Sequence, residues 1–300
     1  MRRILSSIRD GVGFDILLVS LTMIFLLALA GMPLVYNVLM SFQEVDIFNL
    51  ATFWRPFVGL ENYQAVLSQP EFGLVMKNTA VFVFGSIAGQ FSLGFLLAIF
   101  FMAKFPFAST IRGLFLVSWV MPGLVVGALW GWILAGDFGV LNAILRSLGI
   151  IDTTMFWKSD PNLSIWAVTM ANIWLGLAFN MMLLSVGLAA IPRDVYEAAE
   201  LDGANALQRF TSITVPMMRA TIGAVLALGL IYTLQQFDLF PAITEGGPAN
   251  SSSVAQYWAW QRSFVLFDFA KGATISVMML IFVLIASIVY VRSTRHEVRE

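Results

Sequence analysis

The sequence contains no cysteine, and its one histidine, His296, lies near the C-terminus. These absences exclude disulfides, thiol chemistry and metal sites built from Cys and His, so no metal site is expected. Charged residues make up only 12% of the 300 residues, against about 25% in an ordinary soluble domain. The formal net charge of −1 provides no basic surface, so no binding of nucleic acid is expected.

Apolar residues are abundant instead. They account for 59% of the chain, and the mean hydropathy is +0.84. A helix that spans a bilayer needs about 20 mostly apolar residues. The sequence therefore predicts an all-α membrane protein with six spanning helices, at residues 16–39, 79–102, 113–134, 165–188, 221–243 and 273–291.

The predicted organisation is one transmembrane domain over residues 15–293, with a tail at 1–14 and another at 294–300. The first span follows three arginines and resembles a signal peptide in that respect. It runs for more than about 20 residues without a small-residue cleavage pattern, so a retained anchor is expected.

The distribution of basic residues predicts the orientation of these spans. With the N-terminus in the cytoplasm, the inner set holds eleven of the 17 basic residues and the outer set holds six. The positive-inside rule then places both termini in the cytoplasm. The inner set is Arg2, Arg3, Arg9, Lys104, Arg112, Arg193, Arg209, Arg219, Arg292, Arg295 and Arg299.

The longest polar interruption lies between the fourth and fifth spans, at residues 192–219. Asp194 followed by Glu197 predicts a capped helix that begins after Asp194 and runs to Asp202. Gly203 is expected to end this helix in the left-handed conformation. Pro216 is expected to bend or start the segment that leads into the fifth span. A solvated loop of no special role would share this polarity, whereas a short rigid helix below the membrane suits a soluble partner.

The residues Glu197-Ala-Ala-Glu-Leu-Asp-Gly-Ala204, with Phe210, Ile213 and Pro216, resemble the "EAA" loop of permease subunits of binding-protein-dependent ABC importers. Stretches outside the loop resemble the carbohydrate-uptake branch, of the maltose and glycerol-phosphate type. They are Phe57-Val-Gly-Leu-Glu-Asn-Tyr63, Asn78-Thr79, Gly139-Val-Leu-Asn142, Trp174-Leu-Gly176 and Thr244-Glu-Gly-Gly-Pro248. Asn205 and Gln208 occupy positions that the family varies.

This resemblance implies the type I importer fold and a multi-pass protein of the bacterial inner membrane. It implies a second permease subunit as a heterodimer partner, two ATP-binding subunits, and a periplasmic or lipid-anchored solute-binding protein. The chain itself is then not an enzyme and binds no cofactor, because ATP and magnesium belong to the ATPase subunits. The residues that would couple to the ATPase are Glu197, Ala198, Ala199, Asp202, Gly203, Ala204 and Pro216.

The same resemblance places the substrate path on the fourth and fifth spans, where polar residues cluster. The residues expected there are Asn172, Leu175, Gly176, Phe179, Asn180, Thr233, Gln235, Gln236 and Asp238, with Trp130 at the outer end of the third span. Polar groups inside spans also form hydrogen bonds between helices, so two interpretations fit each amide. Asp238 fits a sugar ligand or an interface charge, and Trp130 fits a membrane-interface residue or a stacking surface for a sugar.

Other function classes fit the sequence less well. A secondary transporter or channel places ionisable residues at mid-membrane, and only Asp238 comes close. The motifs G-x-S-x-G and G-x-x-x-x-G-K-[ST] are absent, which argues against a membrane enzyme or an ATPase. The middle of each predicted span lacks basic residues, so a neutral sugar or polyol is favoured over a phosphorylated or sulfonated one.

Overall fold

The computed structural model describes residues 12–103 and 105–297. These residues form helices, turns and one isolated β-bridge between Gln43 and Phe57, with no extended strand among them. The chain divides into two compact units. One unit extends up to Ser68 and includes Ala259–Met278, and the other holds Gln69–Trp258 and the described residues from Met279 onward.

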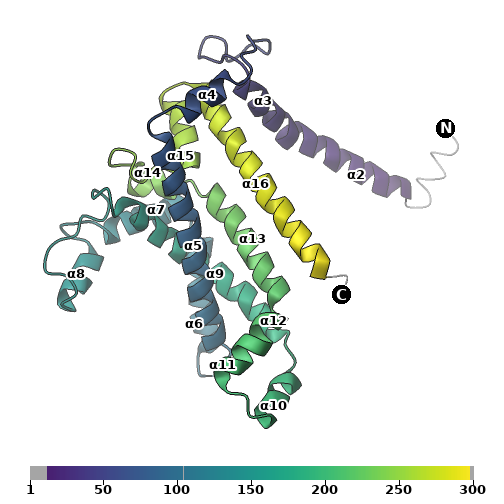
Figure 1. The fold of residues 1–300 in the computed structure, drawn as a ribbon, viewed down its shortest axis with the longest axis vertical. Helices are drawn as coiled ribbons and strands as arrows, with labels where there is room; N and C mark the ends of the chain where they lie inside the picture. The colour runs from purple at the N-terminus through teal and green to yellow at the C-terminus, as the bar shows by residue number, and fades with distance from the viewer. Residues whose placement is uncertain (1–11, 104, 298–300) are drawn as a thin grey trace. The chain divides into compact units, whose positions relative to one another are not determined.

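The first unit begins with α2 (Val12–Leu26), the π-helical turn η1 (Leu27–Gly31) and α3 (Met32–Ser41), which follow one another as a single rod (Figure 1). The π turn has a local cause in Pro33. Proline has no N–H and cannot continue the regular ladder, so the turn before it widens. The Met32 N–H accordingly donates to the Leu27 carbonyl, five residues back.

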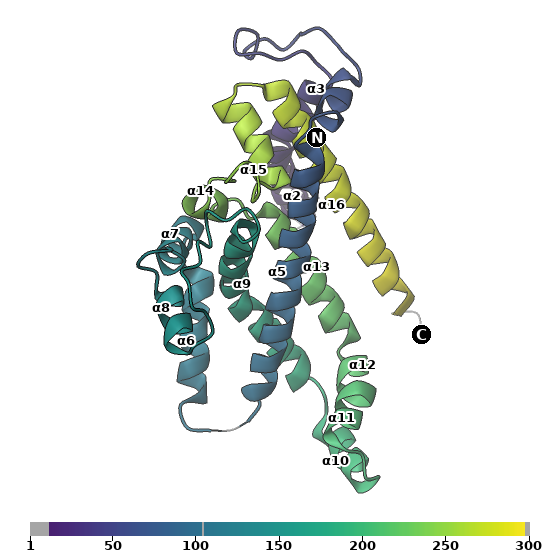
Figure 2. The ribbon, with the colours of Figure 1, turned by 60° about the vertical axis from the view of Figure 1, so that its left-hand side comes forward.

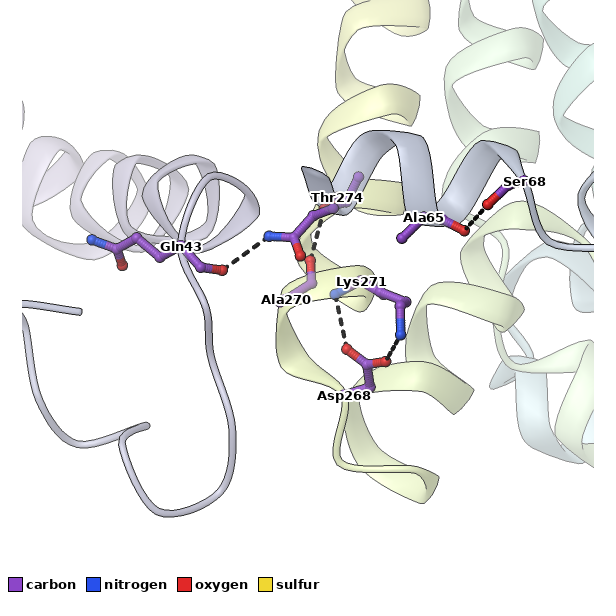
Figure 3. Close-up of polar contacts among 8 residues, drawn as sticks. Gln43, Ala65, Ser68, Asp268, Ala270, Lys271 and Thr274 are labelled. Carbon is purple, nitrogen blue, oxygen red and sulfur yellow. Dashed lines mark hydrogen bonds and ion pairs between the residues drawn. The ribbon is translucent and has the colours of Figure 1, made fainter. Parts of the chain in front are cut away.

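The rest of the first unit packs polar and small groups against the end of α3. Asn62, in α4 (Glu61–Leu67), donates from Nδ2 to the carbonyls of Ser41 and Gln43 at 3.0 and 2.9 Å. Asp268 stands directly before α16 (Phe269–Glu297) and pairs at 2.6 Å with Lys271 in the first turn of that helix (Figure 3). One turn further along, the Thr274 hydroxyl donates to the Ala270 carbonyl. The segments that lead into α16 are α15 (Ala255–Trp260) and η3 (Gln261–Val265).

The second unit is built on the pairing of α5 (Phe72–Phe100) with α9 (Ser164–Ala189). Glycines on α5 allow the two helices to approach closely. A Cβ on Gly89 would lie 2.5 Å from the Ile173 side chain, and one on Gly94 would lie 3.1 Å from the Met181 backbone nitrogen. Small residues at such spacing bring membrane helices into backbone contact. Both helices were predicted from their apolar runs.

The third predicted span is wrong as a single helix. Residues 113–134 form parts of α6 (Ala108–Val120) and α7 (Gly123–Ile133), which are bent by 102°. The break comes from Pro122, because the residue before a proline is pushed out of the helical region. Met121 is indeed extended, with φ −67 and ψ 138. The short helix α8 (Val140–Ser147) follows α7.

The fifth predicted span, 221–243, is also wrong at its outer end. The helix α13 covers Arg219–Gln235, Gln236 is extended, and a separate short helix, α14, covers Leu239–Ile243. At its other end, α13 is bent by 70° from the segment Ala206–Met217. That bend lies beside Pro216, as predicted.

Among the described residues, four helical segments are long and apolar enough to cross a membrane, and up to six spans result if each bent pair counts as one. The four are Gly13–Ser41, Phe72–Phe100, Ser164–Ala189 and Phe269–Ile288. They confirm the helical character of the first, second, fourth and sixth predicted spans. Several residues used to predict orientation lie outside the described residues, namely Arg2, Arg3, Arg9, Lys104 and Arg299.

We expect Gly94→Ala to destabilise the protein, because the added Cβ would meet the backbone of α9 at Asn180 and Met181, which cannot rotate away. Overpacking of this kind costs about 1–3 kcal/mol. Gly73→Ala is the matched control on the same helix, since a Cβ at Gly73 would meet nothing within 4 Å. Thermal unfolding in detergent should show a lower Tm for Gly94→Ala alone. Equal Tm values for both variants would contradict the close α5–α9 contact.

Candidate functional site

A cavity of about 360 Å³ lies among α5, α6, α9 and α13 in the second unit. Its wall combines amide side chains, aromatic rings, glycines and one carboxylate. The lining residues are Gln90, Trp119, Met121, Gly123, Asn172, Leu175, Gly176, Phe179, Asn180, Gly229, Tyr232, Thr233, Gln235, Gln236 and Asp238.

Nine of the ten residues predicted for the substrate path line this cavity. The exception is Trp130. Its ring lies 6.4 Å from that of Trp174, edge to face, and its buried indole N–H has no acceptor among the described residues. The structure therefore brings the predicted residues together, and their role in transport stays a prediction.

One wall of the cavity is a buried amide cluster. Gln90 on α5 donates from Nε2 to the Asn172 carbonyl at 2.8 Å, and its Oε1 is 3.5 Å from Asn180 Nδ2. Asn180 also donates to the Gly176 carbonyl at 2.9 Å. The Asn172 Nδ2 is buried without a partner in the described chain. This wall therefore offers an unused hydrogen-bond donor. An unsatisfied buried donor costs about 1–3 kcal/mol, which a ligand that accepts this bond would offset.

Another part of the lining is aromatic. Phe179 on α9 lies 5.5 Å from Trp119 on α6 and 5.4 Å from Tyr232 on α13, measured between ring centroids. The Phe179–Tyr232 pair is edge to face at 89°. Three helices thus each place one ring at the cavity, and Tyr232 also carries a hydroxyl. Aromatic faces with nearby amides suit a ligand that has both C–H faces and hydroxyl groups.

Asp238 gives the cavity its one carboxylate among the lining residues. It stands directly before α14 and makes no capping bond to that helix. A Cβ on Gly123 would lie 2.7 Å from Asp238 Oδ2, so glycine is required for the carboxylate to approach the first turn of α7. Negative charge is favourable at a helix N-terminus. This contact explains the position of Asp238 whether or not it also binds a ligand.

Several lining residues were not predicted from the sequence, among them Gln90, Trp119 and Tyr232. Gln90 carried a usable signal, because it is the one amide in the predicted span 79–102, which contains no charged residue. Trp119 and Tyr232 carried none, since aromatic residues are common in membrane helices. The predicted span 221–243 would place Thr233 and Gln236, three residues apart, on one helix face. They do not share a face, because α13 ends at Gln235. Both still line the cavity.

A second feature is the coupling segment, which we define as residues 192–219. Its first helix, α10, covers Arg193–Leu201, within two residues of the prediction. Gly203 has φ +78, as expected for the left-handed residue. Its N–H donates to the Glu200 carbonyl at 3.0 Å and the Ala204 N–H to the Ala199 carbonyl at 2.9 Å. These two bonds form a Schellman motif, which satisfies the last carbonyls of the helix.

The predicted cap at the start of α10 is wrong. Pro192 occupies the N-cap position, no side chain caps the helix, and Asp194 and Glu197 are both inside it and exposed. Proline suits this place because the first N–H groups of a helix have no intrahelical partner. The capping box belongs instead to α11 (Ala206–Arg209), where Asn205 and Gln208 bond reciprocally at 2.8 and 2.9 Å.

The coupling segment continues through the π turn η2 (Phe210–Thr214) and α12 (Val215–Met217). Pro216 follows this π turn two residues on, as Pro33 follows η1, and the physical cause is the same. An ion pair between Glu200 and Arg209 ties α10 to α11. Figure 2 shows α10, α11 and α12 together at the far end of α13.

Apolar contacts attach this segment to the helices that line the cavity. Met218 and Phe210 pack in one cluster with Phe95 of α5, Leu184 of α9 and Val225 of α13. Tyr196 of α10 packs against the same cluster, and its hydroxyl lies 2.8 Å from the Thr214 hydroxyl. Packed apolar side chains therefore connect α10 with α5, α9 and α13.

The sequence pattern of one known family matches residues 90–297, and that family is described as "Binding-protein-dependent transport system inner membrane component". The chain belongs to this family. The match covers more than half of the chain, and it includes the whole coupling segment and every residue that lines the cavity. The resemblance to ABC importer permeases is thereby confirmed.

Two curated relatives are similar over most of their length. The trehalose/maltose transport system permease protein MalF of Thermococcus litoralis is 33% identical over 80% of this chain and 81% of its own. The sulfoquinovosyl glycerol transport system permease protein SmoG of Agrobacterium fabrum is 31% identical over 80% of this chain and 77% of its own. Both are named as permeases for sugar-containing solutes.

The fold is shared with a solved structure, the bacterial alginate ABC transporter in complex with an alginate pentasaccharide-bound periplasmic protein. One of its chains matches with a TM-score of 0.80 and 18% identity, over 99% of this chain and 98% of that chain. At this identity the likeness shows the fold alone. The protein is thus an all-α, multi-pass membrane permease subunit, as predicted.

We expect Gln236→Ala to lower uptake while leaving assembly intact, because the side chain lines the cavity and the hydrogen bonds that Gln236 makes to the described residues come from its backbone. Its N–H donates to the Thr233 carbonyl, and its carbonyl accepts from Gln256 Nε2. Loss of one hydrogen bond to a ligand, worth about 1 kcal/mol, predicts a reduction of about fivefold. Gln90→Ala is the comparison variant. It removes the bonds to Asn172 and Asn180 and should lower the Tm.

Uptake into proteoliposomes and the yield of assembled complex are measured for both variants. Normal uptake by Gln236→Ala, or loss of its assembly, would remove Gln236 from the substrate path.

Proposed function

We propose that this chain is the permease subunit of an ATP-driven ABC importer and forms half of a translocation path for a neutral sugar or polyol. A solute-binding protein delivers the solute, and separate subunits hydrolyse ATP. The observation that carries the proposal is the cavity, which gathers an amide wall and an aromatic wall on helices that are also attached to the coupling segment.

The chemistry of the cavity supports the neutral class. Sugar rings present C–H faces that pack on aromatic rings and hydroxyl groups that bond to amides, and both kinds of group are present. The lining set contains Asp238 and no Lys or Arg. A phosphate or sulfonate prefers Arg, Lys or a helix N-terminus. Although one relative is named for a sulfonated solute, this cavity alone offers no cation for it.

The coupling segment supports the second half of the proposal. It is polar, and its first helix ends in an apolar tip, since Leu201 is 90% exposed. Leu207 is also exposed nearby, and Glu197, Ala198 and Asp202 lie on the same short helix or its cap. An exposed leucine next to small and charged residues favours a groove on a soluble subunit. We assign the ATPase contact to Glu197, Ala198, Ala199, Asp202, Gly203 and Ala204, with Pro216 at the bend.

The proposed arrangement has six spans with both termini in the cytoplasm, in the bacterial inner membrane. Each bent pair then counts as one span. A second permease subunit faces the cavity, two ATPase subunits bind the coupling segments, and the solute-binding protein docks outside. ATP and magnesium bind to the ATPase subunits.

The first test concerns coupling. Gly203→Val should reduce the amount of solute imported per ATP hydrolysed, because valine is strongly disfavoured at φ +78 and the Schellman motif would be lost. Gly149→Val is the matched control, since Gly149 has φ +68 and open space around it, outside the coupling segment. Uptake and ATP hydrolysis are measured together in proteoliposomes. An unchanged ratio for Gly203→Val would contradict the coupling role.

The second test concerns topology. The exposed positions Ala51 and Ser212 are separated by three proposed spans, so cysteines there should react from opposite sides of the membrane. The chain has no natural cysteine, so within this chain only the introduced residue can react. If α6 and α7 do not form one span, only two crossings separate the two sites. Labelling of both from the same side in intact cells would then overturn the six-span arrangement.

A further inference from the structure

The segment between α3 and α4, residues 42–60, is held in a fixed shape by Arg55; we call it the outer loop. Arg55 is only 8% exposed. Its Nε donates to the Asn49 carbonyl at 2.9 Å and its Nη1 to Gln43 Oε1 at 3.3 Å. Its Nη2 bonds to the Leu50 carbonyl and to the Tyr36 hydroxyl. The guanidinium also lies 5.1 Å from the centre of the Tyr36 ring.

Backbone bonds close the same loop. The Glu44 N–H donates to the Pro56 carbonyl and the Val58 N–H to the Phe42 carbonyl, each at 2.9 Å. Asp46 Oδ1 accepts from the N–H groups of Phe48 and Asn49. The Gln43 carbonyl, drawn in Figure 3, accepts from Asn62. A loop so constrained loses little conformational entropy when it binds a partner, which favours affinity.

This rigid loop exposes large apolar side chains. Phe48 is 92% exposed and Trp54 is 89% exposed. Ile47, Phe53 and Phe57 are exposed as well. Exposed apolar groups gathered on one short segment mark a site of contact with a protein or a membrane. Tryptophan is also among the residues that contribute most to protein interfaces.

The length of the preceding helix favours a protein over a membrane. The continuous apolar helix Gly13–Ser41 has 29 residues, and at a rise of 1.5 Å per residue it is about 43 Å long. A bilayer with its headgroups is about 40–45 Å thick. This one helix therefore reaches across both headgroup layers, and the outer loop follows its end.

The charges of the outer loop also favour contact with a protein over contact with a membrane, and they indicate the charge of that protein. The exposed charged side chains of the outer loop and the first turn of α4 are Glu44, Asp46 and Glu61, while Arg55 is buried. Anionic lipid headgroups would be repelled by these carboxylates. A protein with an apolar groove and a rim of Lys and Arg would be attracted.

We propose that the outer loop is a docking surface for the solute-binding protein, with Trp54 and Phe48 seated in an apolar groove and Glu44 facing a basic rim. The proposal rests on the importer function proposed above. It adds the site of contact and the chemistry of the contacting face on the partner.

The test uses the complete transporter in nanodiscs and the solute-binding protein that drives its ATP-dependent uptake. Binding is measured by biolayer interferometry at low and high salt. Trp54→Ala should weaken binding by about tenfold or more, as expected for a central interface residue. Glu44→Lys should slow association by about threefold or more at low salt, with the difference lost when salt screens the charges. The hydrogen bonds that Glu44 makes to the described residues come from its backbone, so this change removes none of them.

Phe107→Ala is the control, because Phe107 is comparably exposed and lies on the opposite side in the proposed topology. Gel filtration and basal ATP hydrolysis confirm that each variant is assembled. Wild-type binding by both Trp54→Ala and Glu44→Lys overturns the docking surface and leaves the importer function standing. Failure of any solute-binding protein to drive uptake by the wild-type complex overturns both.

A lipid contact is tested separately. Nanodiscs are prepared with brominated phosphatidylcholine, and the tryptophan fluorescence of the wild type is compared with that of Trp54→Phe. If the loop lies in water, the brominated lipid removes the same amount of tryptophan fluorescence from both proteins. If it removes less from Trp54→Phe than from the wild type, Trp54 lies in the headgroups and the proposal is overturned.

Discussion

The close approach of α5 and α9 is the contact on which the second unit depends. Gly89 and Gly94 remove the side chains that would separate the two helices, and Gly176 makes room for Gln90 from the other side. In a bilayer, apolar side chains gain little by leaving lipid, so packing and interhelical hydrogen bonds must supply the stability. Glycine provides the first, and the amides of Gln90 and Asn180 provide the second. The same atoms form the polar wall of the cavity, so stability and the proposed transport site share their structural basis.

This arrangement also links the cavity to the coupling segment. Near the coupling segment, α5, α9 and α13 hold Phe95, Leu184 and Val225, which pack with Phe210 and Met218 of that segment. At the cavity, the same helices hold Gln90, Asn172 and Thr233. Proteins transmit displacement through packed elements rather than through flexible ones. A partner that moves α10 would thus reach the cavity walls without any separate pathway of residues.

The parts of the fold that could be predicted from the sequence are those determined by neighbouring residues. Apolar runs predicted α5 and α9, and Gly203 predicted the end of α10, because each is a local property. The break at Pro122 was missed because it lies within an uninterrupted apolar run, where composition outweighed one proline. The cap of α10 was misplaced because Asp194 fits the pattern of a cap, while Pro192 takes that position in the fold. Trp119 and Tyr232 join the cavity only through the packing of distant helices, which one sequence does not display.

The aromatic wall is the part of the cavity that is least complete within one chain. Trp119 is 51% exposed and Tyr232 is 54% exposed, although both rings face the same cavity as the buried amides. Large aromatic side chains that are half exposed beside a polar cavity would gain from cover by protein rather than by lipid, because lipid would also meet the exposed Gln235. A second permease subunit would supply that cover. The chain's own geometry therefore favours a path completed between two subunits over one enclosed within a single chain.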